Sequence, residues 1–227
     1  MGHPTFKPVA DRAVLIEFGT EVDDALNRQV VALDHSIAAA GISGVVETVP
    51  ALVNLLVMFD PLITDHGQVE TAIRRLFPIP EQDDGNAKTH VVPVCYDTEL
   101  CPDLIAVAKA TGHSIDAVIA AHLGAKLRVS MYGFAPGYAY LSGLPDMIQV
   151  PRKPSATRGV PTGRVMIAGP QCLITTVVMP TGWSIIGRSP IEIMKDDPDN
   201  PFLFNVGDSV VFERIARDAL PTEMQHP

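Results

Sequence analysis

The stretch RVMIAGPQCLITTVVMPTGWSIIGRS, residues 164–189, decides the fold of the second half of this chain. Its apolar runs RVMIAG, CLITTVVM and WSIIGRS are short and are separated by turns that contain glycine or proline. Such runs between turn residues predict β-strands. Further strands are expected at KLRVSMY, PIEIM and DSVVFERI. From Ala125 onward the pattern is therefore typical of a small β-barrel or sandwich.

The first half alternates strands and helices instead. Strands are predicted at AVLIEF (13–18), VVETV (45–49), LVNLLVMF (52–59) and HVVPVCY (90–96). Apolar residues at helical spacing predict a helix over 23–41, which Asp23 can cap and Gly41 can end, and a second helix over 67–77. The resulting order βαββαβ is that of a ferredoxin-like unit.

These two patterns predict an α+β protein with two domains. Residues 1–88 are expected to form the ferredoxin-like α/β domain, and residues 89–227 the β-barrel domain. A linker is expected at PIPEQDDGNAK (78–88), and the barrel carries a helical insert over 102–124. The two short helices of the insert resemble a helix-turn-helix. The second has no Lys or Arg, so we do not expect it to read DNA.

Charge and cysteine content narrow the functional class. The formal net charge is −9, which argues against nonspecific binding to nucleic acid or to anionic membranes. The three cysteines have no paired spacing, which favours reduced thiols in a cytoplasmic protein, and no metal site is predicted. The first residues lack the pattern of a signal peptide, and no apolar run is long enough to span a bilayer.

The stretch GFAPGYAYLSGLP (133–145) is the first candidate for a binding site. Glycine and proline can fold such a loop so that its backbone N–H groups face an anion. Aromatic side chains could then wall a pocket for a small amide or carboxylate. Alternatively, the aromatics belong to the core and the glycines only shape a corner. The candidate binding residues in this loop are Gly133, Phe134, Pro136, Gly137, Tyr138 and Tyr140.

Four residues elsewhere are further candidates. Arg188 and Arg152 could each hold a carboxylate or phosphate by two parallel hydrogen bonds, with Arg188 the first choice. His122, near the end of the second short helix, could serve in proton transfer or could be a structural residue favoured by the helix dipole. Gln171 could bond an amide substrate. Trp183, the single tryptophan, is expected to be a core residue.

Motifs across the chain resemble the carboxyltransferase-domain family, which includes the B subunit of 5-oxoprolinase, allophanate hydrolase subunit 1 and a sporulation-kinase inhibitor. They occur in the family's order over nearly the whole sequence. The motifs are DRAVLIEFG, ETVPALVNLLVMFDP, CYDTELCPDL, GFAPGYAYLSGLP, VPR, VPTG, IAGPQ, PTGWSIIGRSP and PFLFNVGDSVVF. The resemblance implies a ferredoxin-like N-terminal domain and a cyclophilin-like C-terminal β-barrel.

The chain departs from the family's usual pattern at several positions. Members commonly read PRxxTPRxxVPAGSV, whereas this chain reads PRKPSATRGVPTGRV (151–165). Thr157 therefore replaces a common arginine, and Arg164 replaces a serine. Thr175 and Thr176 stand where Tyr-Pro is usual, and Thr181 replaces the first glycine of the common PGGW. These departures suggest a divergent member with a changed substrate.

The resemblance implies a subunit of an ATP-dependent amidohydrolase that opens 5-oxoproline to glutamate. Such a subunit would act only with a related cyclophilin-like subunit and a separate (β/α)-type subunit, and ATP would be used by the assembled complex. His122 and Arg188 would be its catalytic residues. Two alternatives remain open: a carboxyltransferase half of a urea carboxylase or allophanate system, and a non-enzymatic inhibitor of a sensor histidine kinase. Prolyl isomerisation, suggested by the fold alone, is not expected.

Overall fold

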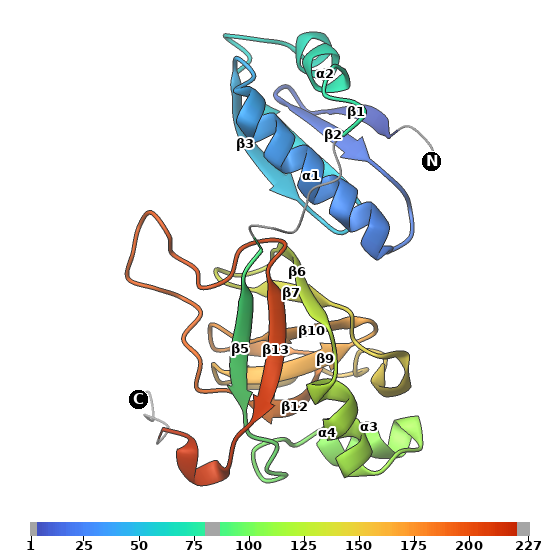
Figure 1. The fold of residues 1–227 in the computed structure, drawn as a ribbon, viewed down its shortest axis with the longest axis vertical. Coiled ribbons are helices and arrows are strands. Elements are labelled where there is room, and N and C mark those ends of the chain that lie inside the picture. The colour runs from blue at the N-terminus through green and yellow to red at the C-terminus, as the bar shows by residue number, and fades with distance from the viewer. Residues whose placement is uncertain (1–3, 80–86, 222–227) are drawn as a thin grey trace. The chain divides into compact units, whose positions relative to one another are not determined.

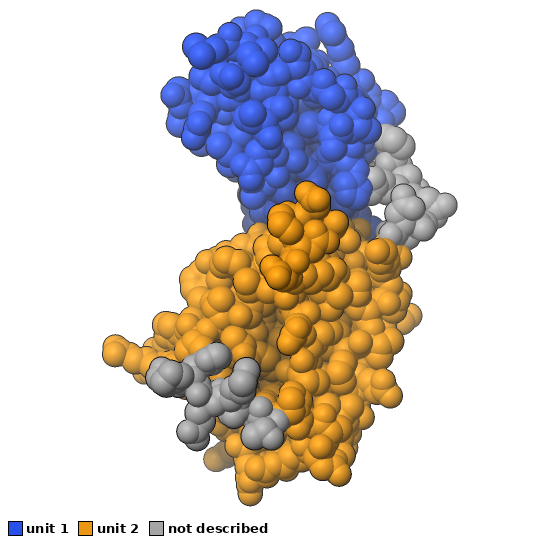
Figure 2. All heavy atoms as spheres, turned by 90° about the vertical axis from the view of Figure 1, so that its left-hand side faces the viewer, with its two compact units in different colours: residues 1–86 blue, residues 87–227 orange. Residues whose placement is uncertain are grey.

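The structure is a computed structural model, which describes residues 4–79 and 87–221. The chain divides into two compact units, residues 1–86 and 87–227 (Figure 2). Most of the stretch predicted as a linker, residues 80–86, lies outside the described residues.

The first unit is a four-stranded antiparallel sheet with two helices. Its strands are β1 (Thr5–Val9), β2 (Ala13–Glu17), β3 (Val45–Pro50) and β4 (Asn54–Phe59), in the spatial order β1-β2-β4-β3. Helix α1 (Asp24–Ala40) follows β2, and helix α2 (His66–Arg74) follows β4 (Figure 1). Alternate strand residues such as Ile16, Leu55 and Val57 form one core cluster with Leu33 and Ile73 of the helices.

The caps of α1 are those expected from the sequence. The Asp23 side chain accepts hydrogen bonds from the backbone N–H groups of Ala25 and Leu26, and Gly41 ends the helix in the left-handed conformation with φ 54°. A glycine is favoured there because it lacks the Cβ that strains this conformation.

The strand predicted at 90–96 does not belong to this sheet, which corrects the expected element order. It is β5 (Thr89–Val94), which pairs in parallel with β13 (Ser209–Arg214) in the second unit. The edge position beside β2 is taken by β1, which pairs antiparallel with it. The α+β class is confirmed, but the first unit runs ββαββα.

The second unit contains a seven-stranded sheet in the order β12-β9-β10-β7-β6-β13-β5. Its other strands are β6 (Leu127–Tyr132), β7 (Ala139–Ser142), β9 (Arg164–Ala168), β10 (Gln171–Ile174) and β12 (Ser184–Arg188). The outermost strands meet just past β5, where Cys95 and Arg188 exchange backbone hydrogen bonds of 2.8 and 2.9 Å. This bridge nearly closes the sheet into a barrel.

Two short helices pack on the barrel. Helix α3 (Leu104–Thr111) contacts β12, and helix α4 (Ile115–Leu123) contacts β13 (Figure 1). Their buried residues, including Leu104, Val107 and Ile119, belong to the barrel core. No single helix in the described ranges has the length and apolarity to cross a bilayer; α3 and α4 pass that test only as a pair bent by 96°.

Two apolar clusters lie on opposite faces of the barrel wall. One holds residues from all seven strands and from α3 and α4, and therefore fills the interior. The other includes Met166, Leu173 and Ile185, which alternate with interior residues along β9, β10 and β12. This outer cluster lies beside a two-stranded ribbon formed by β8 (Thr157–Val160) and β11 (Met179–Thr181).

Some predicted strand bounds in this unit are wrong. The run CLITTVVM stops as a strand at Ile174, and PIEIM (190–194) forms only an isolated bridge between Met194 and Phe202. Strand β7 and ribbon strand β8 occupy segments that the sequence presented as loops. A β-bulge between Val129 and Met131 lets β6 follow β7 around the barrel.

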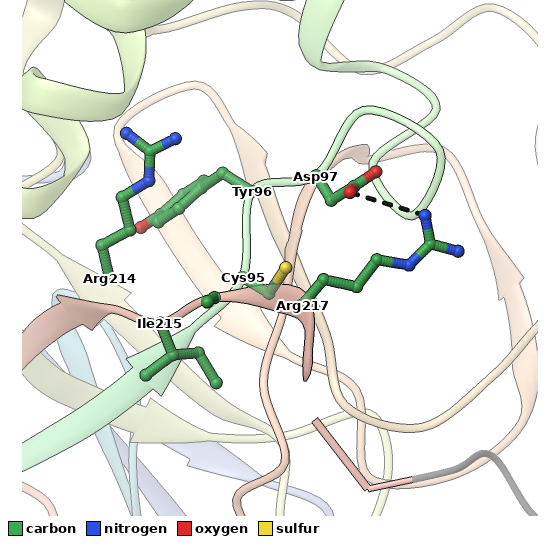
Figure 3. A pocket seen from close by; sticks show the side chains of 7 residues that line it. Cys95, Tyr96, Asp97, Arg214, Ile215 and Arg217 are labelled. Carbon is green, nitrogen blue, oxygen red and sulfur yellow. Dashed lines mark hydrogen bonds and ion pairs between the residues drawn. The ribbon is translucent and has the colours of Figure 1, made fainter. Parts of the chain in front are cut away.

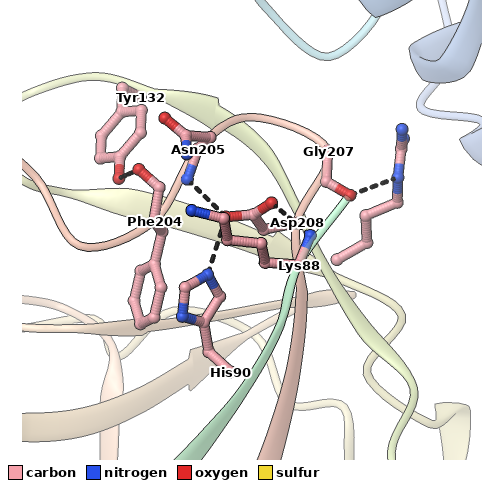
Figure 4. A network of polar contacts seen from close by, with 8 residues as sticks. Lys88, His90, Tyr132, Phe204, Asn205, Gly207 and Asp208 are labelled. Carbon is pink, nitrogen blue, oxygen red and sulfur yellow. Dashed lines mark hydrogen bonds and ion pairs between the residues drawn. The ribbon is translucent and has the colours of Figure 1, made fainter. Parts of the chain in front are cut away.

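A polar cluster fastens the start of β5 to the start of β13. The buried Asp208 carboxylate accepts hydrogen bonds from His90 Nε2 at 2.7 Å and from the backbone N–H groups of Lys88 and Asn205 at 2.9 and 2.8 Å (Figure 4). Burial by itself raises the pKa of Asp208, but these bonds outweigh it, so the pKa lies below its usual value. The His90 ring also packs edge-on against Phe204.

Candidate functional site

A slot lies on the outer face of the barrel, with a cavity volume of about 240 Å³. Its walls come from the 133–140 loop, from strands β9 and β10, and from the ribbon strand β11 with the turn that follows it. The lining residues are Phe134, Tyr138, Tyr140, Arg152, Met166, Leu173, Met179, Pro180, Thr181, Gly182 and Trp183. A slot of this kind suits a small ligand with an apolar body.

Arg152 supplies the positive charge of the slot. Its guanidinium carbon lies 5.5 Å from the centre of the Trp183 ring, and the Trp183 ring in turn meets Tyr140 edge-on at 5.8 Å. Among the residues that the structure describes, no carboxylate pairs with Arg152. A solvent-exposed arginine that lies over an aromatic ring and lines a cavity is well suited to bind an oxyanion.

Two phenols supply neutral hydrogen-bonding groups. Burial raises the pKa of Tyr138 to about 12, and burial also raises the pKa of Tyr140, although Arg152 opposes that shift. Both therefore stay protonated near neutral pH. The Tyr138 hydroxyl donates to Met179 Sδ, whereas the Tyr140 hydroxyl has no hydrogen-bond partner in the described ranges. Tyr140 is thus the phenol that can bond a ligand beside Arg152.

The loop that carries these aromatics has an unusual backbone. Phe134 adopts a positive φ of 71° although it has a side chain, and 76% of its surface is exposed. Such a conformation costs about 1–2 kcal/mol for a residue other than glycine. Gly137 also has a positive φ, and the Pro136 carbonyl accepts a hydrogen bond from Thr176. This loop places the exposed Phe134 ring at the slot, which Phe134 helps to line.

The structure brings four predicted residues together around the slot: Phe134, Tyr138, Tyr140 and Arg152. Gly133, Pro136 and Gly137 shape the same loop without lining the cavity. Gln171 is two residues from Leu173 on β10; its buried Nε2 has no partner among the described residues, but it does not line the slot. The role of these residues in binding stays a prediction.

Arg188 lies elsewhere. Its backbone forms the bridge that closes the barrel, and its guanidinium donates to the Pro221 carbonyl at 3.0 Å. It does not line the slot, so the arginine placed to meet a ligand there is Arg152.

His122 is fully buried in the barrel core. Its Nδ1 lies 2.7 Å from the Tyr96 hydroxyl, its Nε2 lies 3.5 Å from Cys172 Sγ, and its ring stacks on Phe212 at 4.5 Å. Burial lowers the pKa of His122 to about 3, so the ring is neutral. Because burial also keeps Tyr96 protonated, its hydroxyl donates to Nδ1. In this position His122 contacts only protein.

The residues that depart from the family pattern have structural partners. Thr175 Oγ1 donates to the Pro161 carbonyl at 2.7 Å and accepts from the backbone N–H of Arg164 at 2.8 Å. Thr157 Oγ1 accepts from Lys153 Nζ at 2.9 Å. Neither of these threonines lines the slot, nor does Arg164, whereas Thr181, which also departs from the family pattern, is one of the lining residues.

Sequence reasoning missed several lining residues. Trp183, expected in the core, is only 5% exposed, yet it also forms a wall of the slot. Met166 and Leu173 alternate with interior residues on their strands, which marks them as outward-facing but does not reveal a cavity. The contribution of Met179 depends on the pairing of β8 with β11, which no local pattern predicts.

A second cavity, of about 450 Å³, lies where β5 and β13 end. Arg217 forms ion pairs there with Asp97 and Glu99. Arg214 also lines this cavity, and its guanidinium group lies on the side of Tyr96 away from that of Arg217 (Figure 3). The two guanidinium groups do not converge on one point, so this cavity offers no clear oxyanion site. Across the described residues, no group of three or more His, Cys, Asp or Glu side chains could hold a metal ion.

Comparison of the chain with known proteins shows the family to which it belongs. The family model described as "Carboxyltransferase domain, subdomain C and D" matches residues 4–204. A protein of Bacillus subtilis, named as the B subunit of 5-oxoprolinase, is 34% identical, over 92% of this chain and 91% of its own length. The protein of the same name from Escherichia coli O157:H7 is 30% identical, over 90% and 93%.

Solved structures agree in fold. The protein TTHA0988 superposes with a TM-score of 0.81 at 30% identity; the match covers 93% of this chain but only 41% of that longer one. An uncharacterized protein from Pyrococcus horikoshii, PH0987, is 36% identical over 94% of this chain and 99% of its own, with a TM-score of 0.56. The Kluyveromyces lactis urea amidolyase is similar in fold alone, with a TM-score of 0.77 at 19% identity over 96% of this chain and 15% of its own. The chain belongs to the carboxyltransferase-domain family that includes the proteins named as the B subunit of 5-oxoprolinase.

Proposed function

We propose that this chain is a non-autonomous subunit of a cytoplasmic, ATP-dependent 5-oxoprolinase. The observation that carries the proposal is the similarity to proteins named as the B subunit of that enzyme, which extends over at least 90% of both chains. In this reaction ATP would phosphorylate the lactam oxygen and release ADP. Water would then attack the activated carbon and open the ring by breaking its C–N bond, which gives γ-glutamyl phosphate. A second water would hydrolyse this acyl phosphate to glutamate and phosphate.

The slot would hold the substrate carboxylate. 5-Oxoproline is a small, flat ring that carries one carboxylate, and a cavity of about 240 Å³ has room for it. Arg152 would bind the carboxylate, Tyr140 would donate a hydrogen bond, and Trp183 would pack against the ring. The partners would be a related cyclophilin-like subunit and a (β/α)-type subunit, with ATP bound in the assembled complex.

The first experiment is to purify the tagged chain from its native host and identify co-eluting proteins. A stoichiometric complex with a second cyclophilin-like chain, and 5-oxoproline-dependent ATP hydrolysis by that complex, are the expected results. The variant Arg152→Ala should raise KM for 5-oxoproline at least about tenfold, since it removes a charge-assisted contact. Arg158→Ala is the matched control, because Arg158 is exposed on β8 and does not line the slot.

The same purification separates the alternatives. A histidine kinase in place of enzyme subunits, with inhibition of its autophosphorylation, would favour an inhibitor and contradict the proposal. The exposed Phe134 beside the slot suits a protein partner as well as a small ligand. A biotin-carrying partner would favour a carboxyltransferase. The similarity to urea amidolyase supports that reading only at the level of the fold.

A further inference from the structure

The segment that carries Arg152 is fastened at the residue next to it. Lys153 donates its backbone N–H to the Gly182 carbonyl at 2.7 Å. Its ammonium group donates to Asp103 Oδ2 at 2.6 Å and to Thr157 Oγ1 at 2.9 Å. Lys153 is half-buried, whereas its neighbours from Pro151 to Gly159 are exposed. It therefore attaches the start of this segment, whose end is held by the pairing of β8 with β11.

Asp103 connects Lys153 to the strand that begins beside Trp183. Its Oδ2 accepts a hydrogen bond from the backbone N–H of Ile185 at 2.8 Å, and its own N–H donates to the Ile185 carbonyl at 3.1 Å. Asp103 precedes helix α3, but its side chain makes no capping bond to that helix. The Asp103 carboxylate thus bonds to Lys153 and to the backbone of β12.

This arrangement fixes the distance between Arg152 and Trp183. Arg152 adjoins Lys153, and Trp183 lies between Gly182 and Ile185, the two residues to which Lys153 and Asp103 bond. The Lys153 side chain is 22% exposed and the Asp103 side chain 18% exposed. Water therefore competes with this ion pair less than with a pair at the surface. Among the residues that the structure describes, the Trp183 ring is what holds the Arg152 side chain.

We propose that Asp103 and Lys153 are positioning residues that hold Arg152 over Trp183 and so give the slot its selectivity for carboxylate ligands. The ligands of the test rest on the proposed function, but the position of Arg152 can also be measured without a ligand. Neither residue lines the slot, so their effect on a ligand must pass through lining residues beside them, Arg152 or the Gly182–Trp183 turn, and a variant of Arg152 separates the two.

The ligand test uses the full chain, or its complex, and the fluorescence of Trp183, the single tryptophan. 5-Oxoproline is compared with 2-pyrrolidinone, the same ring without the carboxylate. Lys153→Met should weaken 5-oxoproline binding by about tenfold and change 2-pyrrolidinone binding by less than about twofold. Lys109→Met, an exposed lysine on α3, should change neither. In the Arg152→Ala background, Lys153→Met should have no further effect.

Equal weakening of both ligands, or a Lys153→Met effect that adds in full to that of Arg152→Ala, would overturn the proposal. If the wild-type protein binds neither ligand, the substrate assignment fails, and the ligand-free test decides the positioning role alone.

That test compares quenching of Trp183 by iodide with quenching by neutral acrylamide. A cation over the ring favours iodide, so Arg152→Ala should lower the iodide-to-acrylamide ratio. Asp103→Asn removes a negative charge, which by charge alone raises the ratio, whereas displacement of Arg152 lowers it. A fall is expected. A rise, with urea unfolding showing an intact fold, would refute the positioning role.

Discussion

The buried His122 predicts how the barrel unit responds to acid. Its pKa in the folded protein is about 3, against 6.5 for an unperturbed histidine. Only the unfolded chain therefore binds a proton as pH falls below 6.5, and the free energy of unfolding must decrease. The loss approaches about 1.4 kcal/mol per pH unit. Between pH 6.5 and pH 4.5 it amounts to about 2 kcal/mol.

The variant His122→Gln removes this proton uptake while keeping a side chain that can bond the Tyr96 hydroxyl. Urea unfolding should be followed by the fluorescence of Trp183, because this single tryptophan reports the second unit alone. The variant will be less stable at pH 7, since it loses the ring that stacks on Phe212. The informative quantity is the slope with pH, which should be shallower by about 2 kcal/mol over this range.

Parallel slopes for the two proteins would refute the reasoning, because they would mean that His122 is protonated in the folded state or is open to solvent. The same variant bears on catalysis. If His122 is structural, the assembled complex should keep its turnover wherever the variant remains folded.

Three further predictions concern the barrel unit. Gly163→Ala should lower the free energy of unfolding by about 1–3 kcal/mol in urea titrations, because φ is +73° and a Cβ would lie 2.4 Å from the Ser189 carbonyl oxygen. Asp208→Asn should destabilise at pH 7, and it should flatten the loss of stability below about pH 4, where the lowered pKa of Asp208 makes folded wild type resist protonation. Phe134→Gly should relieve backbone strain and raise the free energy of unfolding by up to about 1 kcal/mol, yet weaken ligand binding as measured by Trp183 fluorescence.

The parts of the fold that local chemistry dictates could be predicted from the sequence. Asp23 and Gly41 mark the ends of α1 because capping depends on neighbouring residues. The parallel pairing of β5 with β13 could not be predicted, since it joins segments far apart in the chain. Residues 90–96 alternate like an ordinary strand, and nothing in them indicates which sheet they join.

The candidate site shows the same division. The composition of the 133–140 loop and the charge of Arg152 predict candidates that meet around one slot. The sequence favours Arg188 over Arg152 because Arg188 lies at a predicted strand end beside Gly187 within a strong motif. Only the closed barrel shows that this strand end lies away from the slot. Trp183 is expected in the core, and its burial agrees with this expectation. It also lines the slot, since one part of so large a side chain can face a cavity while the rest is buried.

The pairing of β5 with β13 has a consequence for synthesis on the ribosome. Lys88 and Asp208, which meet at the start of the two strands, are 120 residues apart. At translation rates of about 5–20 residues per second, roughly 6–24 s pass between the synthesis of β5 and that of β13, its neighbour in the described sheet. An unpaired strand is a template for aggregation during that interval. Pro93 lies within β5 and has no backbone N–H, so it cannot donate a hydrogen bond to a strand from another chain. This lowers the risk of aggregation until β13 has been synthesised.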